Sequence, residues 1–228
     1  MNGTGGSPVG YNESMRILVA LLALSHAAAA GEPAPASPPP GARELARAVQ
    51  AFYERTRDLE AAFVQTYSYA AGGRRQVSRG TLRVKKPGRM RWDYQAPERK
   101  TVAVVGSRLV QWEPEANQVY VDERFDAAAM SAAVTFLLGR GNLEAEFHVS
   151  SGGPRQLVLR PRKPDSRVES VTLTVGPDGQ VTATRVEDGQ GNVNLVELAD
   201  IRRNLRLEDS DFEVRVPEGA HRLAAPGR

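Results

Sequence analysis

Hydrophobic and polar residues alternate along Val77–Trp92, on both sides of a turn. Leu82 and Val84 alternate with polar neighbours, which is the period-two pattern of a half-buried β-strand. Pro87 and Gly88 interrupt this pattern, as these residue types do in turns. The apolar side of the segment that follows carries Met90, Trp92 and Tyr94. The stretch therefore predicts two paired strands with one apolar, aromatic face and one basic face.

The same alternation recurs along most of the chain. In Leu59–Tyr69, one side carries Leu59, Ala61, Phe63, Gln65, Tyr67 and Tyr69. Short segments follow, separated by turn residues, a spacing typical of antiparallel folds. These predicted strands are Thr101–Val105, Arg108–Glu113, Gln118–Asp122, Glu144–Val149, Arg155–Pro161, Arg167–Val175, Gln180–Glu187 and Asn192–Arg202. Alternation at Phe212, Val214 and Val216 predicts a further edge strand.

Two segments follow helical patterns instead. Ala42–Asp58 is amphipathic, with apolar positions at spacings of three and four: Leu45, Val49, Phe52 and Tyr53. Asp126–Leu138 is apolar nearly all round and ends before Gly139, a C-cap residue. This second helix is either a plain core helix or a lid over a cavity. The fold predicted from all these elements is mainly β with α: one large curved antiparallel sheet of about eleven short strands, closed or nearly closed, with helices over one opening.

Residues 1–30 have the layout of a secretory signal peptide. Arg16 precedes an apolar run, Ile17–Leu24, and small residues lead to an Ala-x-Ala site at Ala28–Ala30. The run is too short to span a bilayer. We expect translation to start at Met15 and the protein to be released into the periplasm. The alternative is a cytoplasmic chain with an apolar N-terminal helix.

One domain is expected after this segment. Residues 31–41 are rich in Pro and Ala without periodicity, which is typical of a linker. Residues 42–228 are long enough for one domain with its own core. The chain has 41% hydrophobic and 25% charged residues, as ordinary globular chains do.

The residue inventory argues against most catalytic chemistry. The chain has no cysteine, which excludes disulfides, thiol catalysis and cysteine-ligated zinc. Its histidines, His26, His148 and His221, are far apart in sequence, and no G-x-S-x-G or P-loop motif is present. Glu144 and Glu146 share one face of a predicted strand, where an acid–base pair is conceivable, but a solvated face is the commoner outcome. We therefore expect a protein that is not an enzyme, with no cofactor and no metal site.

A basic cluster is the one electrostatic feature of note. The net charge is only +3, but the predicted strand pair carries Arg83, Lys85, Lys86, Arg89 and Arg91. Two interpretations remain open: the cluster is the solvated side of the strand pair, or it attracts anionic lipid head groups or an acidic partner. Nucleic acid is not an expected partner, because no aromatic residues are interleaved on the basic side.

Several short motifs together resemble a known family. They are F-x-Q (Phe63–Gln65), G-x-L-x-V-K-K-P-x-x-M-R-W (Gly80–Trp92), Tyr94, Pro97, V-Q-W-x-P (Val110–Pro114), Gln118-Val119 and F-E-V-R-V-P-E-G (Phe212–Gly219). From Leu45 to Leu223 the chain resembles the periplasmic outer-membrane lipoprotein carriers, the LolA family. The long central motif is the most specific of these. Met90 stands where Phe is common, and Lys86 stands where the best-known members have Arg.

The resemblance implies an incomplete (half-open), strongly curved antiparallel β-barrel of about eleven strands, lidded by helices, whose concave apolar face takes up acyl chains. It also implies a periplasmic chaperone that carries lipoproteins from the inner to the outer membrane. Its partners would be lipoprotein acyl chains, an inner-membrane ABC-type release complex and an outer-membrane acceptor, with transient membrane contact and a monomeric state. The implied acyl-chain residues are Phe63, Leu82, Val84, Met90, Trp92 and Trp112 on the sheet, and Met130, Val134, Phe136 and Leu137 on the lid. Lys86 would be the basic residue linked to lid closure and transfer.

The same half-barrel fold also serves other roles, so alternatives stay open at this stage. One is a carrier of another amphipathic lipid, and another is an envelope-stress sensor or regulatory binding protein. An enzyme would require a convergent polar site around Glu144, Glu146 and His148.

Overall fold

The structure is a computed structural model that describes residues 40–125, 142–163 and 167–223. Its helical segments are α2 (Pro40–Glu54), α4 (Leu143–Glu146), and the 3-10 turns η1 (Ala71–Gly73) and η3 (Asp209–Phe212). The strands are β1 (Asp58–Ser68), β2 (Arg75–Lys85), β3 (Arg89–Ala96), β4 (Lys100–Val105), β5 (Arg108–Glu113), β6 (Gln118–Asp122), β7 (Phe147–Gly153), β8 (Gln156–Pro161), β9 (Ser170–Val175), β10 (Val181–Glu187), β11 (Val193–Arg203) and β12 (His221–Leu223). No helix within these ranges is long and apolar enough to cross a membrane.

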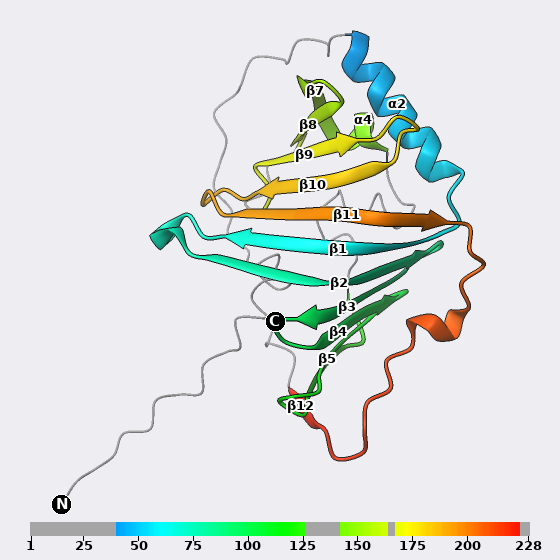
Figure 1. The fold of residues 1–228 in the computed structure, drawn as a ribbon, viewed down its shortest axis with the longest axis vertical. Coiled ribbons are helices and arrows are strands. Elements are labelled where there is room, and N and C mark those ends of the chain that lie inside the picture. The colour runs from blue at the N-terminus through cyan, green and yellow to red at the C-terminus, as the bar shows by residue number, and fades with distance from the viewer. Residues whose placement is uncertain (1–39, 126–141, 164–166, 224–228) are drawn as a thin grey trace, which may run out of the picture.

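The strands of the described residues form one 12-stranded sheet, in the order β12-β6-β5-β4-β3-β2-β1-β11-β10-β9-β8-β7. Neighbours pair antiparallel, except that β12 runs parallel to β6. Figure 1 shows the strands stacked from β7 beside α2 down to β12 at the opposite end. Since β7 and β12 are the two edges, the sheet is not closed. The predicted half-open, mainly β fold is confirmed, with one strand more than expected.

The two faces of the sheet can be followed across the strand pairs. We call the side that packs against α2 the inner face and the other side the outer face. Residues directly opposite each other in a ladder lie on the same face. Val171 pairs with Val186, Val186 with Asn194, and Asn194 with Tyr67. The inner face is therefore continuous from β9 through β10 and β11 to β1.

Helix α2 covers the β7–β10 part of the inner face. Its buried side recurs every three or four residues: Ala42, Ala46, Val49, Phe52 and Tyr53. Pro40 is its first residue, where a missing backbone N–H is tolerated. The helix ends at Glu54, four residues before the predicted end, because Thr56 Oγ1 donates to the Phe52 carbonyl at 2.8 Å and satisfies an end carbonyl. The predicted linker is likewise shorter by Pro40 and Gly41.

A close approach between α2 and the turn that joins β9 to β10 fixes the helix on the sheet. Gly179 in that turn has φ 94°, and a Cβ there would lie 2.3 Å from the Ala48 carbonyl oxygen. Only glycine fits both the backbone angle and the space. The buried apolar cluster beneath α2 consists of residues from α2, α4, β7, β8, β9 and β10, together with Val168.

Two predicted strands are corrected by the structure. Glu144–Glu146 belongs to α4 instead of a strand, because the Asn142 side chain accepts hydrogen bonds from the backbone N–H groups of Glu144 (2.9 Å) and Ala145 (3.2 Å). β7 then begins at Phe147. Glu144 and Glu146 therefore do not share a strand face.

The tail is the second correction. Phe212, Val214 and Val216 form no strand; Phe212 ends η3, where Glu208 and Asp211 form a capping box that turns the chain. The edge strand comes later, at His221–Leu223. Figure 1 shows this C-terminal segment leaving β11 and running along the side of the sheet to its far edge.

Candidate functional site

Three aromatic side chains meet at the centre of the inner face. The Phe63 ring lies edge-on to Trp92 at 4.8 Å and to Tyr94 at 5.0 Å between ring centroids. Gly80 on β2 pairs with both Phe63 and Tyr94. A Cβ at Gly80 would lie 2.8 Å from Phe63 Cε1, so the glycine makes room for this aromatic cluster. Edge-to-face geometry of this kind is favourable beyond simple burial.

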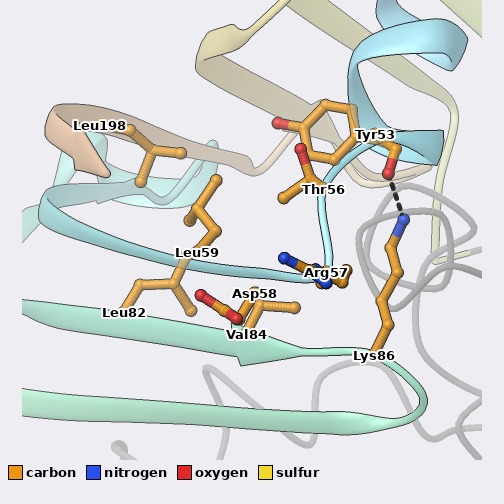
Figure 2. Close-up of a pocket in the computed structure, with 9 residues that line it drawn as sticks. All are labelled: Tyr53, Thr56, Arg57, Asp58, Leu59, Leu82, Val84, Lys86 and Leu198. Atoms are coloured by element: carbon orange, nitrogen blue, oxygen red, sulfur yellow. Dashed lines mark hydrogen bonds between the residues drawn. The ribbon is translucent and has the colours of Figure 1, made fainter. Parts of the chain in front are cut away.

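A pocket opens at the junction between α2 and β1 (Figure 2). Its walls come from the sheet and from this junction, and its lining residues are Tyr53, Thr56, Arg57, Asp58, Leu59, Leu82, Val84, Lys86 and Leu198. Figure 2 shows Leu59, Leu82, Val84 and Leu198 grouped on one side and Lys86 on the other. The pocket therefore joins apolar sheet residues to a single lysine beside the end of α2.

Lys86 bridges the sheet and the helix. Its Nζ donates a hydrogen bond to the Tyr53 carbonyl in the last turn of α2, drawn as the dashed line in Figure 2. A cation at this position satisfies an end carbonyl and interacts favourably with the helix dipole. Partial burial lowers the pKa of Lys86, and the nearby charge of Glu54 offsets part of that shift.

Further along the strands, the inner face becomes polar. Tyr94 Oη donates to Gln65 Oε1 at 2.9 Å, and Gln65 Nε2 donates to Asn194 Oδ1 at 3.0 Å. Ser78, opposite Gln65, is also buried. Buried amides and hydroxyls are costly without partners, and Tyr94, Gln65 and Asn194 satisfy one another across three strands. Burial raises the pKa of the Tyr94 phenol.

Charged residues extend this polar region onto β4 and β5. Lys100, opposite Tyr94, is 8% exposed, and its Nζ lies 4.3 Å from the centre of the Tyr94 ring. Gln111 Nε2 donates to Glu113 Oε1 at 2.6 Å, and both residues are buried. Burial lowers the pKa of Lys100, while the charges of Glu113 and Glu98 raise it. The inner face thus changes from apolar near the pocket to polar and charged two rows further along.

Comparison with known families gives one decisive match. Residues 54–215 match the family model described as outer membrane lipoprotein carrier protein LolA. The chain belongs to the LolA family. The matched range begins at the last residue of α2, includes the polar region and all the pocket residues except Tyr53, and ends in the segment after η3.

Individual relatives agree with this assignment. The outer-membrane lipoprotein carrier protein of Dechloromonas aromatica is 30% identical over 173 residues, which cover 74% of this chain and 82% of that protein. That of Alkalilimnicola ehrlichii is 27% identical over 176 residues, which cover 77% of this chain and 82% of that protein. A solved structure of an uncharacterized conserved protein from Thermus thermophilus aligns with a TM-score of 0.51 at 12% identity, over 80% of this chain and 98% of that chain. The structural likeness concerns the fold alone.

Membership of the LolA family supports a general role as a carrier of lipoproteins, in a family of non-enzymatic periplasmic proteins. The structure brings several residues of the predicted site together. Phe63, Leu82, Val84 and Met90 belong to one buried cluster on the inner face, and Trp92 packs against it. The predicted site residues on the proposed lid, Met130, Val134, Phe136 and Leu137, lie outside the described residues, as do most of the predicted linker and the whole predicted signal peptide.

Trp112 lies on the other face. It pairs with Thr101 and Val119 in the ladders of β5. Thr101 Oγ1 donates to Asp93 Oδ1 at 2.8 Å on the outer face. The register of β5 therefore points Leu109 and Gln111 inward and Trp112 outward, which corrects the prediction that Trp112 lines the cavity.

The basic cluster is paired within the chain. Arg83 binds Glu60 at 2.7 Å and Asp93 at 3.1 Å. Lys85 and Arg89 both reach Asp209 in η3, at 2.6 and 2.7 Å. Arg91 binds Asp93 and donates to the backbone carbonyls of Asp211 and Glu213. Much of the cluster therefore holds the C-terminal segment against the outer face of β2 and β3.

Some residues of the candidate site were not among the residues predicted from the sequence. Lys100 alternates with Val102 and Val104, but the predicted strand started one residue later, at Thr101. Leu198 also alternates inward on β11, and it lines the pocket only because β11 pairs with β1. Among the described residues, no group of three or more His, Asp or Glu side chains is placed to hold a metal ion.

Proposed function

We propose that this chain is a periplasmic chaperone that binds the acyl chains of lipoproteins on its inner face and carries them from the inner to the outer membrane. It would receive them from an ABC-type release complex in the inner membrane and deliver them to an outer-membrane acceptor, as a monomer with transient membrane contact. The observation that carries the proposal is the apolar pocket on the inner face of a LolA-family half-barrel.

Acyl chains suit such a site for a physical reason. Each CH₂ removed from water contributes about 0.8 kcal/mol, so three chains fully buried in a rigid cavity would never be released. An open sheet with a pocket at one margin can bury chains in part. Leu59, Leu82, Val84 and Leu198 provide the apolar walls.

Lys86 is the residue we assign to the transfer step. It lines the pocket and donates a hydrogen bond to the carbonyl of Tyr53. This bond connects the last turn of α2 to the C-terminal end of β2. Breaking this one hydrogen bond would loosen the helix from the sheet at the pocket. An Arg would make planar bidentate contacts there, which the single Lys ammonium cannot make.

The test is native mass spectrometry of the protein purified from its own cell envelope, with extraction of the bound lipid. The proposal predicts a triacylated lipoprotein bound one to one. Co-purification of a phospholipid or glycolipid alone would contradict the lipoprotein cargo. An empty protein that also accepts no lipoprotein from inner-membrane vesicles would contradict lipid carriage altogether.

A matched pair of variants on β11 tests which face of the sheet binds the lipid. Leu198 and Leu195 are both half-buried, and their positions in the ladder put Leu198 inward with Phe63 and Leu195 outward with Thr66. Leu198→Asn should lower lipoprotein occupancy about tenfold, because an amide facing hydrocarbon costs roughly 1–3 kcal/mol. Leu195→Asn should leave occupancy unchanged. Equal effects of the two changes would place the lipid elsewhere.

A further inference from the structure

Lys100 is a largely buried lysine whose ammonium lies against an aromatic ring. The residue is 8% exposed and lies on the inner face of β4, in line with Val102 and Val104. Its Nζ contacts the face of the Tyr94 ring at 4.3 Å. Among the residues that the structure describes, it forms neither a hydrogen bond nor an ion pair; Glu113 and Glu98 act on it only through their charge. An ammonium carries three donors, which can bind the polar atoms of a ligand that reaches the inner face.

Its neighbours use their own donors. Tyr94 Oη donates to Gln65, Gln65 donates to Asn194, and Gln111 donates to Glu113. Along this part of the inner face, the ammonium donors of Lys100 therefore remain available to a ligand. The cation–π contact with Tyr94 holds the ammonium in place without consuming its hydrogen-bonding capacity.

The position of Lys100 relative to the pocket suits an amphiphile. Val84 and Met90 pair in the row nearest the pocket, and Tyr94 and Lys100 pair four residues further along the strands. This separation is about 13 Å at the rise of a β-strand. A ligand with hydrocarbon against Leu82 and Val84 would therefore present its first polar atoms close to Lys100.

We propose that Lys100 is a ligand-binding residue whose ammonium donates hydrogen bonds to the ester and amide carbonyl oxygens that link acyl chains to the first residue of a lipoprotein. This inference rests on the function proposed above and adds a polar anchor to an apolar site. Carbonyl oxygens taken out of water need donors, and a donor in a low-dielectric site is worth more than one in water. A few placed polar groups in a mostly apolar pocket are what fixes the orientation of a bound ligand.

The test compares two probes on the purified protein: a tripalmitoylated cysteinyl peptide, and dodecylpyrene, a hydrocarbon without oxygen. Lys100→Met keeps the length of the side chain and removes its donors. It should weaken binding of the peptide about tenfold, as expected for a hydrogen bond to a charged group, and leave dodecylpyrene binding unchanged. Lys100→Gln retains N–H donors and should fall between Lys100→Met and the original protein. Lys163→Met, at an exposed lysine after β8, is the matched control and should change neither probe.

The outcomes separate the two claims. If Lys100→Met keeps the circular dichroism spectrum and binds the peptide as tightly as the original protein, the anchor is wrong and the carrier function stands. If both probes weaken equally, Lys100 only supports the structure and the anchor is wrong. If the original protein binds no peptide but binds dipalmitoylphosphatidylglycerol in a Lys100-dependent way, the anchor for lipid oxygens is supported and the lipoprotein cargo is contradicted.

Discussion

The two parts of the inner face differ in their chemistry although they share one sheet. Beneath α2, strands β7–β10 contribute an apolar cluster, which we call the scaffold half. Strands β1–β6, the carrier half, combine an apolar cluster with buried Gln65, Ser78, Lys100, Gln111 and Glu113 and adjoin the pocket. Apolar packing alone is the simplest way to stabilise a sheet. Within the part of the chain that the structure describes, buried polar side chains occur in the carrier half and not in the scaffold half, which points to function in the carrier half.

The largest contrast should come from equivalent aromatic truncations in the two halves. Phe52→Ala in α2 removes a side chain that is 1% exposed, and we expect it to lower the free energy of unfolding by about 3–5 kcal/mol. Phe63→Ala in the carrier half should cost less stability, because its aromatic neighbours can relax toward the pocket, but it should weaken lipid binding more. Urea unfolding measures the loss in free energy of unfolding for each variant. Equal losses of stability would remove the distinction between the halves.

A smaller effect is expected from Gly80→Ala in the carrier half. The new Cβ would lie 1.9 Å from the Asp93 carbonyl oxygen, and backbone cannot move aside easily. We expect a loss of about 1–3 kcal/mol, the usual cost of overpacking, together with a changed tryptophan fluorescence from the Phe63–Trp92 cluster. Gly41→Ala is the control, because nothing lies within 4 Å of its new Cβ and alanine favours a helix. An unchanged stability of Gly80→Ala would show that this strand pair is looser than described.

The smallest effect concerns Lys86, which links the two halves. Lys86→Met removes the hydrogen bond to the Tyr53 carbonyl and should lower the free energy of unfolding by about 1 kcal/mol, since relief of the buried charge offsets part of the loss.

The contribution of Lys86 to the free energy of unfolding depends on pH. Burial lowers the pKa of Lys86 from 10.5, so between the lowered value and 10.5 the unfolded chain binds more protons than the folded one. The contribution of Lys86 to stability is therefore fully present above pH 10.5 and falls as pH drops through the lowered pKa. The difference between the original protein and Lys86→Met should grow toward high pH in urea unfolding. A difference that shrinks there would contradict the placement of Lys86.

Much of the fold follows from local patterns. Alternation of Leu82 and Val84 predicted β2 and its inward side, and periodic Val49 and Phe52 predicted the buried side of α2. Where a capping side chain competed with alternation, prediction failed: Asn142 turned a predicted strand start into α4. Helix ends and short caps depend on single hydrogen bonds, which hydrophobic patterns do not record.

The site was harder to predict because it depends on contacts distant in sequence. The motif around Lys86 indicated a functional lysine, but its bond to Tyr53 joins residues from two separate elements. Trp112 was assigned inward from its motif, whereas the register of β5 turns it outward. Lys100 appeared as an ordinary charged residue before a strand, and only the pairing with Tyr94 shows that it is buried.

The central claim is that lipid binds the carrier half while the scaffold half stays unchanged. Amide hydrogen exchange with and without the tripalmitoylated cysteinyl peptide tests this most directly. We predict added protection or altered exchange in β1–β6, in β11 around Leu198 and in the last turn of α2, with β7–β10 unchanged. Changes centred on β7–β10, or no change in β1–β6 at saturating peptide, would contradict it.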